Sequence, residues 1–323
     1  MKHLFAAATL ALGIAVAPGL ASAQSYPSGP IRIIVPFAAG GNVDVTARTV
    51  APVLGEILGQ AVVVENRPGA GGMVGAESVM SSPPDGLTLM MGSNSTLSVG
   101  PNLFSNWPYD PVKGLTPITN IQFVPFALVV RDDSEFKTVA DVLAKAKETP
   151  GDVTMAHAGN GTANHLVSEL FEMLTGTEYL MVPYQGGAPA MTDLLGGQVQ
   201  LYFDQASTTS PQVAAGRVRA LAVTSPEPWA SLPDTPTFDS AGVKDFNLMN
   251  VTGLVGPAGM SAEVVEAIRA AVGKALENAD VKARFEQLGV QVVGSSPDEF
   301  MDFIQEDLAR WARVIKEAGI EVK

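Results

Sequence analysis

The sequence predicts an α/β protein made of two lobes. Short apolar strands alternate with amphipathic helices along most of the chain, a block in the middle has a complete set of such elements, and the last part is helical. Strands that alternate with helices imply βαβ units and a parallel sheet. We expect the helical last part to pack back on the first lobe. The chain would then cross between the lobes twice, near residues 126–130 and 248–254, and form a hinge.

The first 23 residues have the pattern of an export signal. A short basic start precedes an almost wholly apolar run at residues 4–17, and Ala21-Ser22-Ala23 fits a small-x-small cleavage site. We therefore expect cleavage after Ala23. A membrane anchor is the alternative, but this run is shorter than the roughly 20 residues that a spanning helix needs.

The elements of the first lobe follow from the spacing of apolar residues. Residues 31–36 are a β-branched run typical of a buried strand. Residues 43–58 carry apolar side chains at helical spacing. Residues 61–65 and 88–91 are the next expected strands.

A second set of elements follows the strand expected at residues 123–131. Thr138 has the position of a helix N-cap. The remaining elements expected here are strands at residues 153–156, 181–184, 200–203 and 220–223 and helices at residues 163–174 and 188–195. This set predicts that residues 128–251 form the second lobe.

The C-terminal part contains two helix starts. Ser261 opens a helix that runs to about Glu277, and Ser296 begins a capping box with Pro297 at the first helical position. The helix after Ser296 is expected to bury Phe300, Phe303, Ile304, Leu308, Trp311 and Ile315. Residues 24–127 plus 252–323 would then form the first lobe.

The charge and the cysteine count exclude several classes of protein. The chain has 20 Lys and Arg against 33 Asp and Glu, and cleavage would remove Lys2, so the mature net charge is 19 − 33 = −14. An acidic surface argues against nucleic-acid partners and anionic membrane surfaces. With no Cys in the sequence, a disulfide framework, a thiolate nucleophile and a lipid-anchored Cys are excluded.

Two glycine-rich loops, each between a strand and a helix, are the main candidates for a binding site. The first spans residues 36–44 and includes Gly40 and Asp44; the second spans residues 158–165. Glycines let a backbone approach a ligand closely, and helix N-termini attract anions. The alternative for the first loop is an ordinary tight turn with Asp44 as a first-turn acid. For the second it is a plain N-cap, which is compatible with binding.

Further polar residues follow other strands. Ser93 to Thr96 come directly after one strand of the first lobe, and Asp204 and Gln205 follow the Tyr202-Phe203 strand. Such positions are expected at one edge of a parallel sheet, where ligands bind in α/β proteins. The alternative for Asp204 is a solvated loop acid.

Motifs of catalysis and metal binding are missing from the sequence. It has no Gly-x-Ser-x-Gly elbow, no His-Glu-x-x-His and no phosphate loop with Lys. His157 and His165 are the histidines that remain after cleavage, and no cluster of further ligands surrounds them in the sequence. We therefore expect neither an enzyme nor a metal or cofactor site.

The order of the motifs resembles one family over essentially the whole mature chain. That family is the extracytoplasmic solute-binding proteins of tripartite tricarboxylate transporters, also called Bug proteins. The residues that carry the resemblance are VPFAAGGNVDVTAR at 35–48, VENRPGAGG at 64–72, PDGLTL at 84–89, Gly159-Asn160-Gly161-Thr162 with His165, VPYQG at 182–186, residues 190–197 and LAVT at 221–224.

The resemblance implies a periplasmic-binding-protein fold of the second topological type, whose cleft binds a carboxylate through two loops, partly through ordered water. The ligand-binding residues that it implies are Phe37, Ala39, Gly40 and Asp44 in the first loop, Gly159, Asn160, Thr162 and His165 in the second, and Ser93, Tyr184 and Asp204 along the cleft. The resemblance implies two partners, a small carboxylate ligand and the transporter's membrane subunits. The ligand would be a di- or tricarboxylate, an acidic amino acid or an aromatic acid. The implied state is a periplasmic monomer. The chain departs from the family at residues 156–158, where members often have Ser.

Two other functions remain open from the sequence. A ligand-sensing periplasmic receptor for a membrane sensor kinase would have the same fold. A periplasmic hydrolase acting through His165 and Asp204 is the other, and the missing nucleophile motif argues against it.

Overall fold

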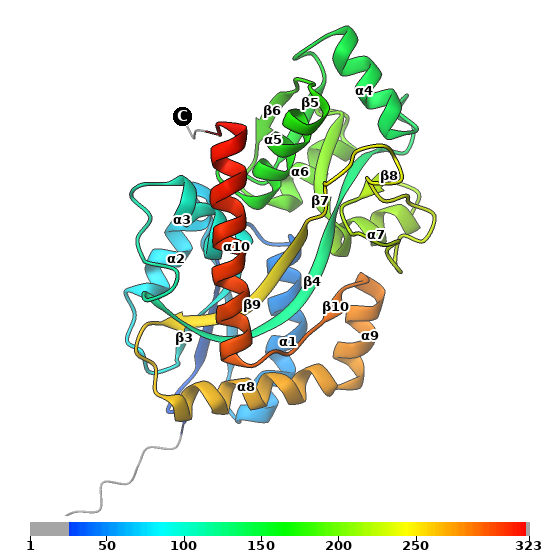
Figure 1. The fold of residues 1–323 in the computed structure, drawn as a ribbon. Helices are drawn as coiled ribbons and strands as arrows, with labels where there is room; N and C mark the ends of the chain where they lie inside the picture. Colours follow the sequence, from blue (N-terminus) through cyan, green and yellow to red (C-terminus); the bar gives the residue numbers. More distant parts are fainter. Residues whose placement is uncertain (1–25, 321–323) are drawn as a thin grey trace, which may run out of the picture.

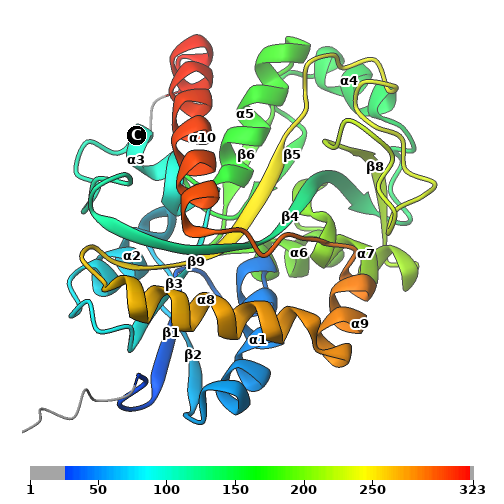
Figure 2. The same cartoon turned by 60° about the horizontal axis from the view of Figure 1, so that its bottom comes forward.

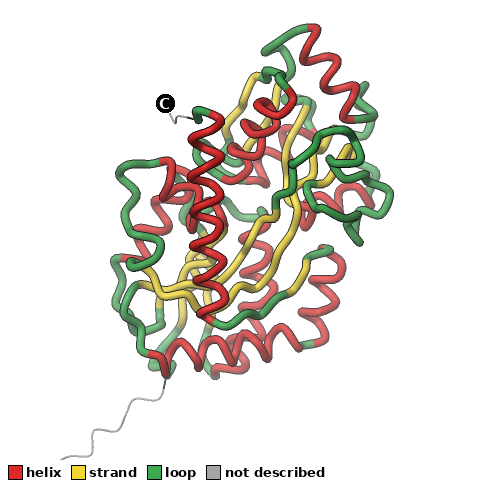
Figure 3. The backbone as a smooth tube through the Cα atoms, in the orientation of Figure 1, coloured by secondary structure: helices red, strands yellow, loops and turns green. Residues whose placement is uncertain are grey.

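The computed structural model describes residues 26–320, so the expected cleavage after Ala23 lies outside the described residues. Figure 1 shows the arrangement: a lower part with α1, α2, α8 and α9, an upper part with α4 to α7, and two long strands that run between them. Figure 3 shows strands enclosed by helices in both parts. Within residues 26–320, no helix is long and apolar enough to cross a membrane.

The described chain alternates strands and helices as the sequence predicts. The strands are β1 (Ile31–Val35), β2 (Val62–Asn66), β3 (Thr88–Ser93), β4 (Leu115–Arg131), β5 (Thr154–His157), β6 (Leu180–Pro183), β7 (Leu201–Gln205), β8 (Val218–Val223), β9 (Met249–Pro257) and β10 (Gln291–Val292). The helices are α1 (Asn42–Leu58), α2 (Met73–Met80), α3 (Gly100–Leu103), α4 (Val139–Glu148), α5 (Ala163–Thr175), α6 (Gly187–Leu195), α7 (Ala206–Ala214), α8 (Ala262–Glu277), α9 (Ala279–Leu288) and α10 (Pro297–Ala318). Two short turns complete the set, a 3₁₀ turn η1 (Ala70–Gly72) and a π-helical turn η2 (Ser95–Val99).

The strands form a mixed sheet, which corrects the expectation of a parallel one. The order is β2-β1-β3-β9-β4-β7-β5-β6, and β8 and β10 also pair with β4. The βαβ units are parallel as predicted, since β1 pairs with β2 and β3, and β5 pairs with β6 and β7. All pairs that involve β4 or β9 are antiparallel, because these two strands carry the chain between the lobes in opposite directions.

The two crossings lie side by side. Residues Leu115–Pro125 of β4 pair with β9, and from Phe126 onward β4 pairs with β7 and β8. On the return, Leu248 donates its backbone N–H to Thr224 of the second lobe, and Met249 already pairs with Pro125. A hinge of two neighbouring strands lets the lobes close and open as bodies. The division at residues 127/128 and 251/252 stays a prediction.

Helix α10 contacts both lobes, whereas the sequence led us to expect that the C-terminal part packs back on the first lobe. Its N-terminal half places Phe300 and Ile304 in an apolar cluster of the first lobe. Trp311, 2 % exposed, belongs to the core of the second lobe. Figures 1 and 2 both show α10 passing beside β4 toward α5. The contact with the second lobe was not expected, because helical spacing gives the buried face of a helix but not its partner.

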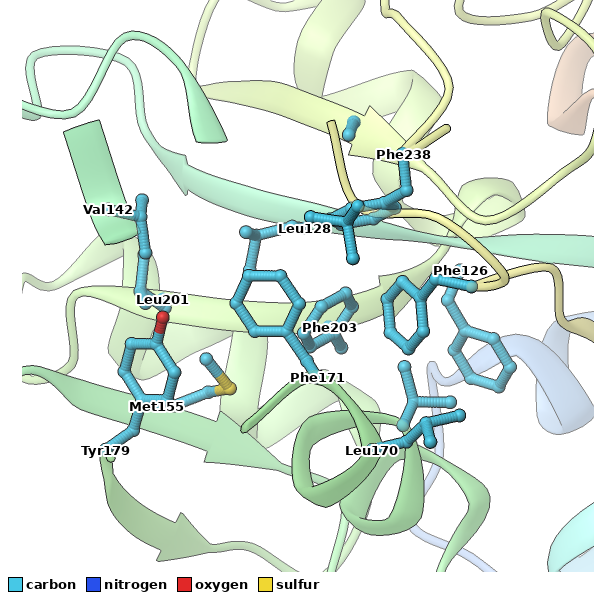
Figure 4. Packing of buried hydrophobic residues seen from close by; sticks show 14 of the residues in the cluster. Phe126, Leu128, Val142, Met155, Leu170, Phe171, Tyr179, Leu201, Phe203 and Phe238 are labelled. Atoms are coloured by element: carbon cyan, nitrogen blue, oxygen red, sulfur yellow. The ribbon is translucent and has the colours of Figure 1, made fainter. Parts of the chain in front are cut away.

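The second lobe has an aromatic core. Phe171 lies at its centre, and its ring centroid is 5.4 to 5.9 Å from those of Phe203, Phe238, Phe246 and Tyr179. Figure 4 shows the rings of Phe171, Phe203 and Phe238 close together in this core. The first lobe instead has an aliphatic core, led by Ile31, Ile33 and other branched side chains of β1 and α1. Each lobe therefore has its own core, as expected of domains that move relative to each other.

Candidate functional site

A small buried cavity lies where the loops of the two lobes meet. Its volume is about 30 Å³, room for roughly two water molecules. The residues that line it are Phe37, Ala38, Gly41, Asn42, Val43, Asp44, Ser93 and Ser95 from the first lobe and Ala158, Asn164, Gly187 and Gln205 from the second. The structure is therefore a closed form of the cleft.

Residues at the starts of three helices line this cavity. Gly41, Gly186 and Gln205 are the N-caps of α1, α6 and α7, and none of them provides a side-chain hydrogen bond to its helix. The first N–H groups of a helix have no partner within the helix and carry the positive end of its dipole. A cavity next to these starts is suited to a small anion.

The first loop is shaped by its own acid. Asp44, 3 % exposed, accepts the backbone N–H of Gly40 at 2.8 Å and the side-chain N–H of Asn66 at 2.8 Å. Arg48 donates to the same carboxylate at 3.0 Å. The carboxylate of Asp44 thus accepts hydrogen bonds that fix the first loop, and the guanidinium of Arg48 is bonded to Asp44. Of the other predicted residues, Phe37 lines the cavity and Ala39 is exposed.

Asn42 is a site residue that sequence reasoning missed. Its side chain donates to Thr252 Oγ1 at 2.9 Å and accepts from Gln122 Nε2 at 3.0 Å and from Ser207 Oγ at 2.6 Å. Ser207 belongs to the second lobe, and the other two belong to the crossing strands. Asn42 therefore joins the start of α1 to both lobes at the hinge. The position of Asn42 directly after Gly40-Gly41 in the first loop is the feature of the sequence that could have indicated its role.

The second loop is capped by its own threonine. Thr162 Oγ1 accepts the backbone N–H of His165 at 3.3 Å and donates to the carbonyl of Gly159 at 2.7 Å. The capping alternative for Thr162 is thus confirmed. Its contact with a ligand stays a prediction, since Thr162 does not line the cavity described above.

The two histidines pack beneath this loop and not along the cavity. The ring centroids of His157 and His165 are 4.5 Å apart, and His165 Nε2 lies 3.3 Å from Glu169 Oε1. Burial and the neighbouring His165 lower the pKa of His157 to about 3. Among the described residues, no group of three or more His, Cys, Asp or Glu is placed to hold a metal ion.

Glycines let the lobes touch. A Cβ on Gly186, whose φ is +152°, would lie 3.1 Å from the backbone N of Ala38 in the first lobe. A Cβ on Gly71 would lie 2.8 Å from the carbonyl oxygen of Asn160 in the second. Ala38 also donates its N–H to the carbonyl of Gln185 at 3.3 Å. At these positions the backbone of one lobe lies directly against the backbone of the other.

A second, wider cavity lies beside the small one, with a volume of about 340 Å³. It contains three more of the predicted residues, Gly159, Asn160 and Tyr184, together with Phe37 and the turn at residues 69–72. Tyr184 donates its hydroxyl to Asp193 at 2.8 Å. Six of the eleven predicted residues therefore line one of two neighbouring cavities, and Phe37 lines both.

Asp204 lies behind the start of α6 and does not line either cavity. It is 1 % exposed and accepts from the hydroxyls of Thr208 at 2.7 Å and Thr209 at 3.1 Å. Burial raises its pKa to about 6. The alternative that Asp204 is a solvated loop acid is therefore wrong, and a direct contact between Asp204 and a ligand stays a prediction.

The small cavity has polar groups but no basic side chain. Among the described residues that line it, none is Lys or Arg, and Asp44 is the acid. Ser93, Ser95, Asn164 and Gln205 are lining residues with hydroxyl or amide groups. Hydroxyls, amides and helix N-termini can bind a carboxylate without a cationic side chain. Ser95, Asn164, Gln205 and Gly187 were not on the predicted site, because the sequence does not show which loops meet.

Comparison with known proteins supports this interpretation. The profile of the family described as "Tripartite tricarboxylate transporter family receptor" matches residues 46–320. The protein BugT of Bordetella pertussis is 34% identical over 324 residues, which is 100% of this chain and 99% of BugT.

Solved structures agree with the fold. The periplasmic binding protein BugD superposes with a TM-score of 0.89 at 35% identity, covering 92% of this chain and 100% of BugD. The structure of Rpa4515 of R. palustris with adipate superposes with a TM-score of 0.88 at 32% identity, covering 92% of this chain and 99% of Rpa4515. The structure of MatC of Rhodopseudomonas palustris with bound malate superposes with a TM-score of 0.87 at 31% identity, covering 90% of this chain and 100% of MatC. The chain has the periplasmic-binding-protein fold, and it belongs to the tripartite tricarboxylate transporter receptor family, or Bug family, of solute-binding proteins, which are not enzymes.

Proposed function

We propose that this protein is a periplasmic receptor that captures a small dicarboxylate between its lobes and delivers it to the membrane subunits of a tripartite tricarboxylate transporter. The observation that carries the proposal is the convergence of uncapped helix starts from both lobes on one cavity that has no basic side chain among its described lining residues. Such a site would bind a carboxylate through backbone N–H groups.

The relatives support the class of ligand. The structure of Rpa4515 contains adipate and that of MatC contains malate, and these two ligands are dicarboxylates. Both structures cover 90% or more of this chain, so the comparison includes both lobes. We infer that one ligand carboxylate faces the start of α1 and that the other end of the ligand extends into the wider cavity near Tyr184.

Binding would require the lobes to separate and close again. The small cavity holds about 30 Å³, which is a tenth of the roughly 300 Å³ at the lower end of small-molecule sites. Closure removes the ligand from water and strengthens each hydrogen bond to it. Two or three charge-assisted bonds of about 1.5–3 kcal/mol each, with burial, are enough for micromolar affinity, or about −8 kcal/mol.

A thermal-shift screen tests the proposal. The mature protein is unfolded and refolded to remove carried-over ligand, and then measured with malate, with adipate and with the corresponding diamides. A ligand at one hundred times its dissociation constant adds about 2.7 kcal/mol of stability, which raises Tm by several degrees. We expect a shift with at least one diacid and none with its diamide. Equal shifts with acid and diamide, or no shift across a wider carboxylate panel, would contradict the proposal.

A further inference from the structure

The turn that carries Ser95 contacts both lobes. This turn, η2, is a π-helical turn, and all five of its residues are buried. Such turns are rare and occur frequently at functional sites. Ser95 Oγ accepts the backbone N–H of Ala163, the first residue of α5, at 2.9 Å. A hydroxyl of the first lobe thus caps a helix of the second lobe.

The cap from Ser95 complements the cap within α5. Thr162, the N-cap of α5, accepts from the N–H of His165 and leaves the N–H of Ala163 to another partner. Each of the first N–H groups of a helix needs a partner from outside the helix. In the closed form Ser95 is that partner, and separation of the lobes would remove it.

Asp307 holds the same turn from its other side. This carboxylate on α10 is 2 % exposed and accepts from Asn94 Nδ2 at 2.7 Å and from Ser98 Oγ. Asn94 Oδ1 accepts the N–H of Val251 in β9 at 2.6 Å. The residues on both sides of Ser95 are therefore fixed to α10 and to a crossing strand.

A buried carboxylate is a costly way to pack a helix. Burial raises the pKa of Asp307, and the hydrogen bonds from Ser98 and Asn94 and the charge of Arg310 counteract it only in part. For packing alone, an apolar side chain of similar volume serves as well or better. What the carboxylate adds is geometry, because it accepts from two donors that flank Ser95.

We propose that Ser95 and Asp307 form a latch between the lobes: Ser95 caps α5 when the cleft closes, and Asp307 is the positioning residue that keeps the Ser95 turn in place. The latch belongs to the ligand-free protein, and only its effect on affinity depends on the proposed function. Since a ligand is bound by the closed form, a latch that stabilises this form raises affinity, and Asp307 contributes to it although it does not line the small cavity.

Amide hydrogen exchange of the full chain without ligand tests the latch. In Ser95→Ala and in Asp307→Asn, we expect the N–H of Ala163 to exchange at least about fivefold faster, as for the loss of one ordinary hydrogen bond. Glu306→Gln, an exposed change on the same helix, and Ser81→Ala, an exposed change on the first lobe, are the matched controls. The start of α4, in the same lobe but outside the latch, should not change. No rise at Ala163, or an equal rise at α4, would overturn the proposal.

A double-mutant cycle with malate as the probe tests the link between the two residues. Each single variant should weaken malate binding by about three- to tenfold, and the double variant should bind no more weakly than the weaker single one, because Asp307 acts through Ser95. Additive losses would overturn the positioning role of Asp307. If malate fails to bind the unmodified protein, the choice of ligand under the proposed function fails, and the exchange experiment still decides the latch.

Discussion

The starts of α1 and α5 look alike in sequence and are built differently. Both follow a strand through a glycine-rich loop. The N-cap of α1 is Gly41, which provides no side-chain hydrogen bond, and its loop is held from behind by Asp44. The N-cap of α5 is Thr162, which does bond to its helix, and Ser95 of the opposite lobe bonds to the next N–H.

The difference assigns different roles to the two loops. The start of α1 is shaped but left uncapped, so its N–H groups are available to an anion. The start of α5 is already satisfied in the closed form, so it contributes chiefly to closure. Three substitutions test this assignment and a fourth tests the buried charge of Asp204 behind the start of α6; they follow from the largest expected effect to the smallest.

Gly40→Val should abolish most of the binding. Gly40 has a φ of +86°, and a Cβ there would lie 3.3 Å from Ala188 Cβ of the second lobe. Overpacking of this kind costs up to about 3 kcal/mol, or roughly 100-fold in affinity, because the lobes would not close fully. Titration calorimetry with a dicarboxylate measures it. Gly59→Val is the control, since Gly59 has a similar φ of +66° and open space around it. Equal losses in both variants would refute the role of close approach.

Asp204→Asn should stabilise the protein in a pH-dependent manner. The pKa of Asp204 is raised to about 6 in the folded state, so its protonated form favours folding below about pH 4, and that contribution is lost as pH rises through 6. At pH 8 the ionised group should cost at most about 3 kcal/mol, which Asn avoids while still accepting from Thr208 and Thr209. Urea unfolding at pH 4 and pH 8 measures the difference. An equal effect at both pH values would contradict this account.

Asp44→Ala should weaken binding by roughly 1–3 kcal/mol, because the N–H of Gly40 and the amide of Asn66 lose their acceptor and the loop loses its shape. The dissociation constant of the dicarboxylate is the measured quantity. Glu56→Ala, an exposed acid on the same helix, serves as the control for net charge. Unchanged affinity in Asp44→Ala would remove the first loop from the site.

Thr162→Ala should lower stability by about 1 kcal/mol, the usual value of an N-cap, and weaken binding by less than the same amount. Thr138→Ala removes the equivalent cap of α4, which has a complete capping box with Asp141. Both variants should lose similar stability in thermal unfolding, but only Thr162→Ala should also change affinity. A large affinity loss in Thr162→Ala would mean that the second loop binds the ligand as directly as the first.

Local structure could be predicted from the sequence, because it depends on neighbours in the chain. The caps at Thr138, Ser261 and Ser296 are all present, and the first strand and helix begin within one residue of the predicted positions. Four helices were missed: α2, α3, α7 and α9. In α7 the run Ala206–Ala214 is rich in Ser and Thr and contains Pro211, which hides the helical pattern.

Contacts between distant segments could not be predicted. The direction of β4 and β9 and the partners of α10 depend on where the hinge lies. For the site, Phe37, Asp44 and Ser93 do line the small cavity, since strand-to-helix loops of one lobe meet at one sheet edge. Three further lining residues were not among the predicted binding residues, because the sequence does not show which side chains of a loop face the other lobe: Asn42, Ser95 and Gln205.

The most direct test of the central claim is to follow backbone amide signals by NMR while a dicarboxylate that passes the thermal screen is added. If helix starts bind the carboxylate, the amide protons of Asn42 and Val43 should shift downfield in proportion to occupancy, and Arg side-chain signals should stay in place. If the largest shifts fall on Arg48, Arg67 or another guanidinium, or the start of α1 does not respond, then a cationic side chain holds the ligand and the account is contradicted.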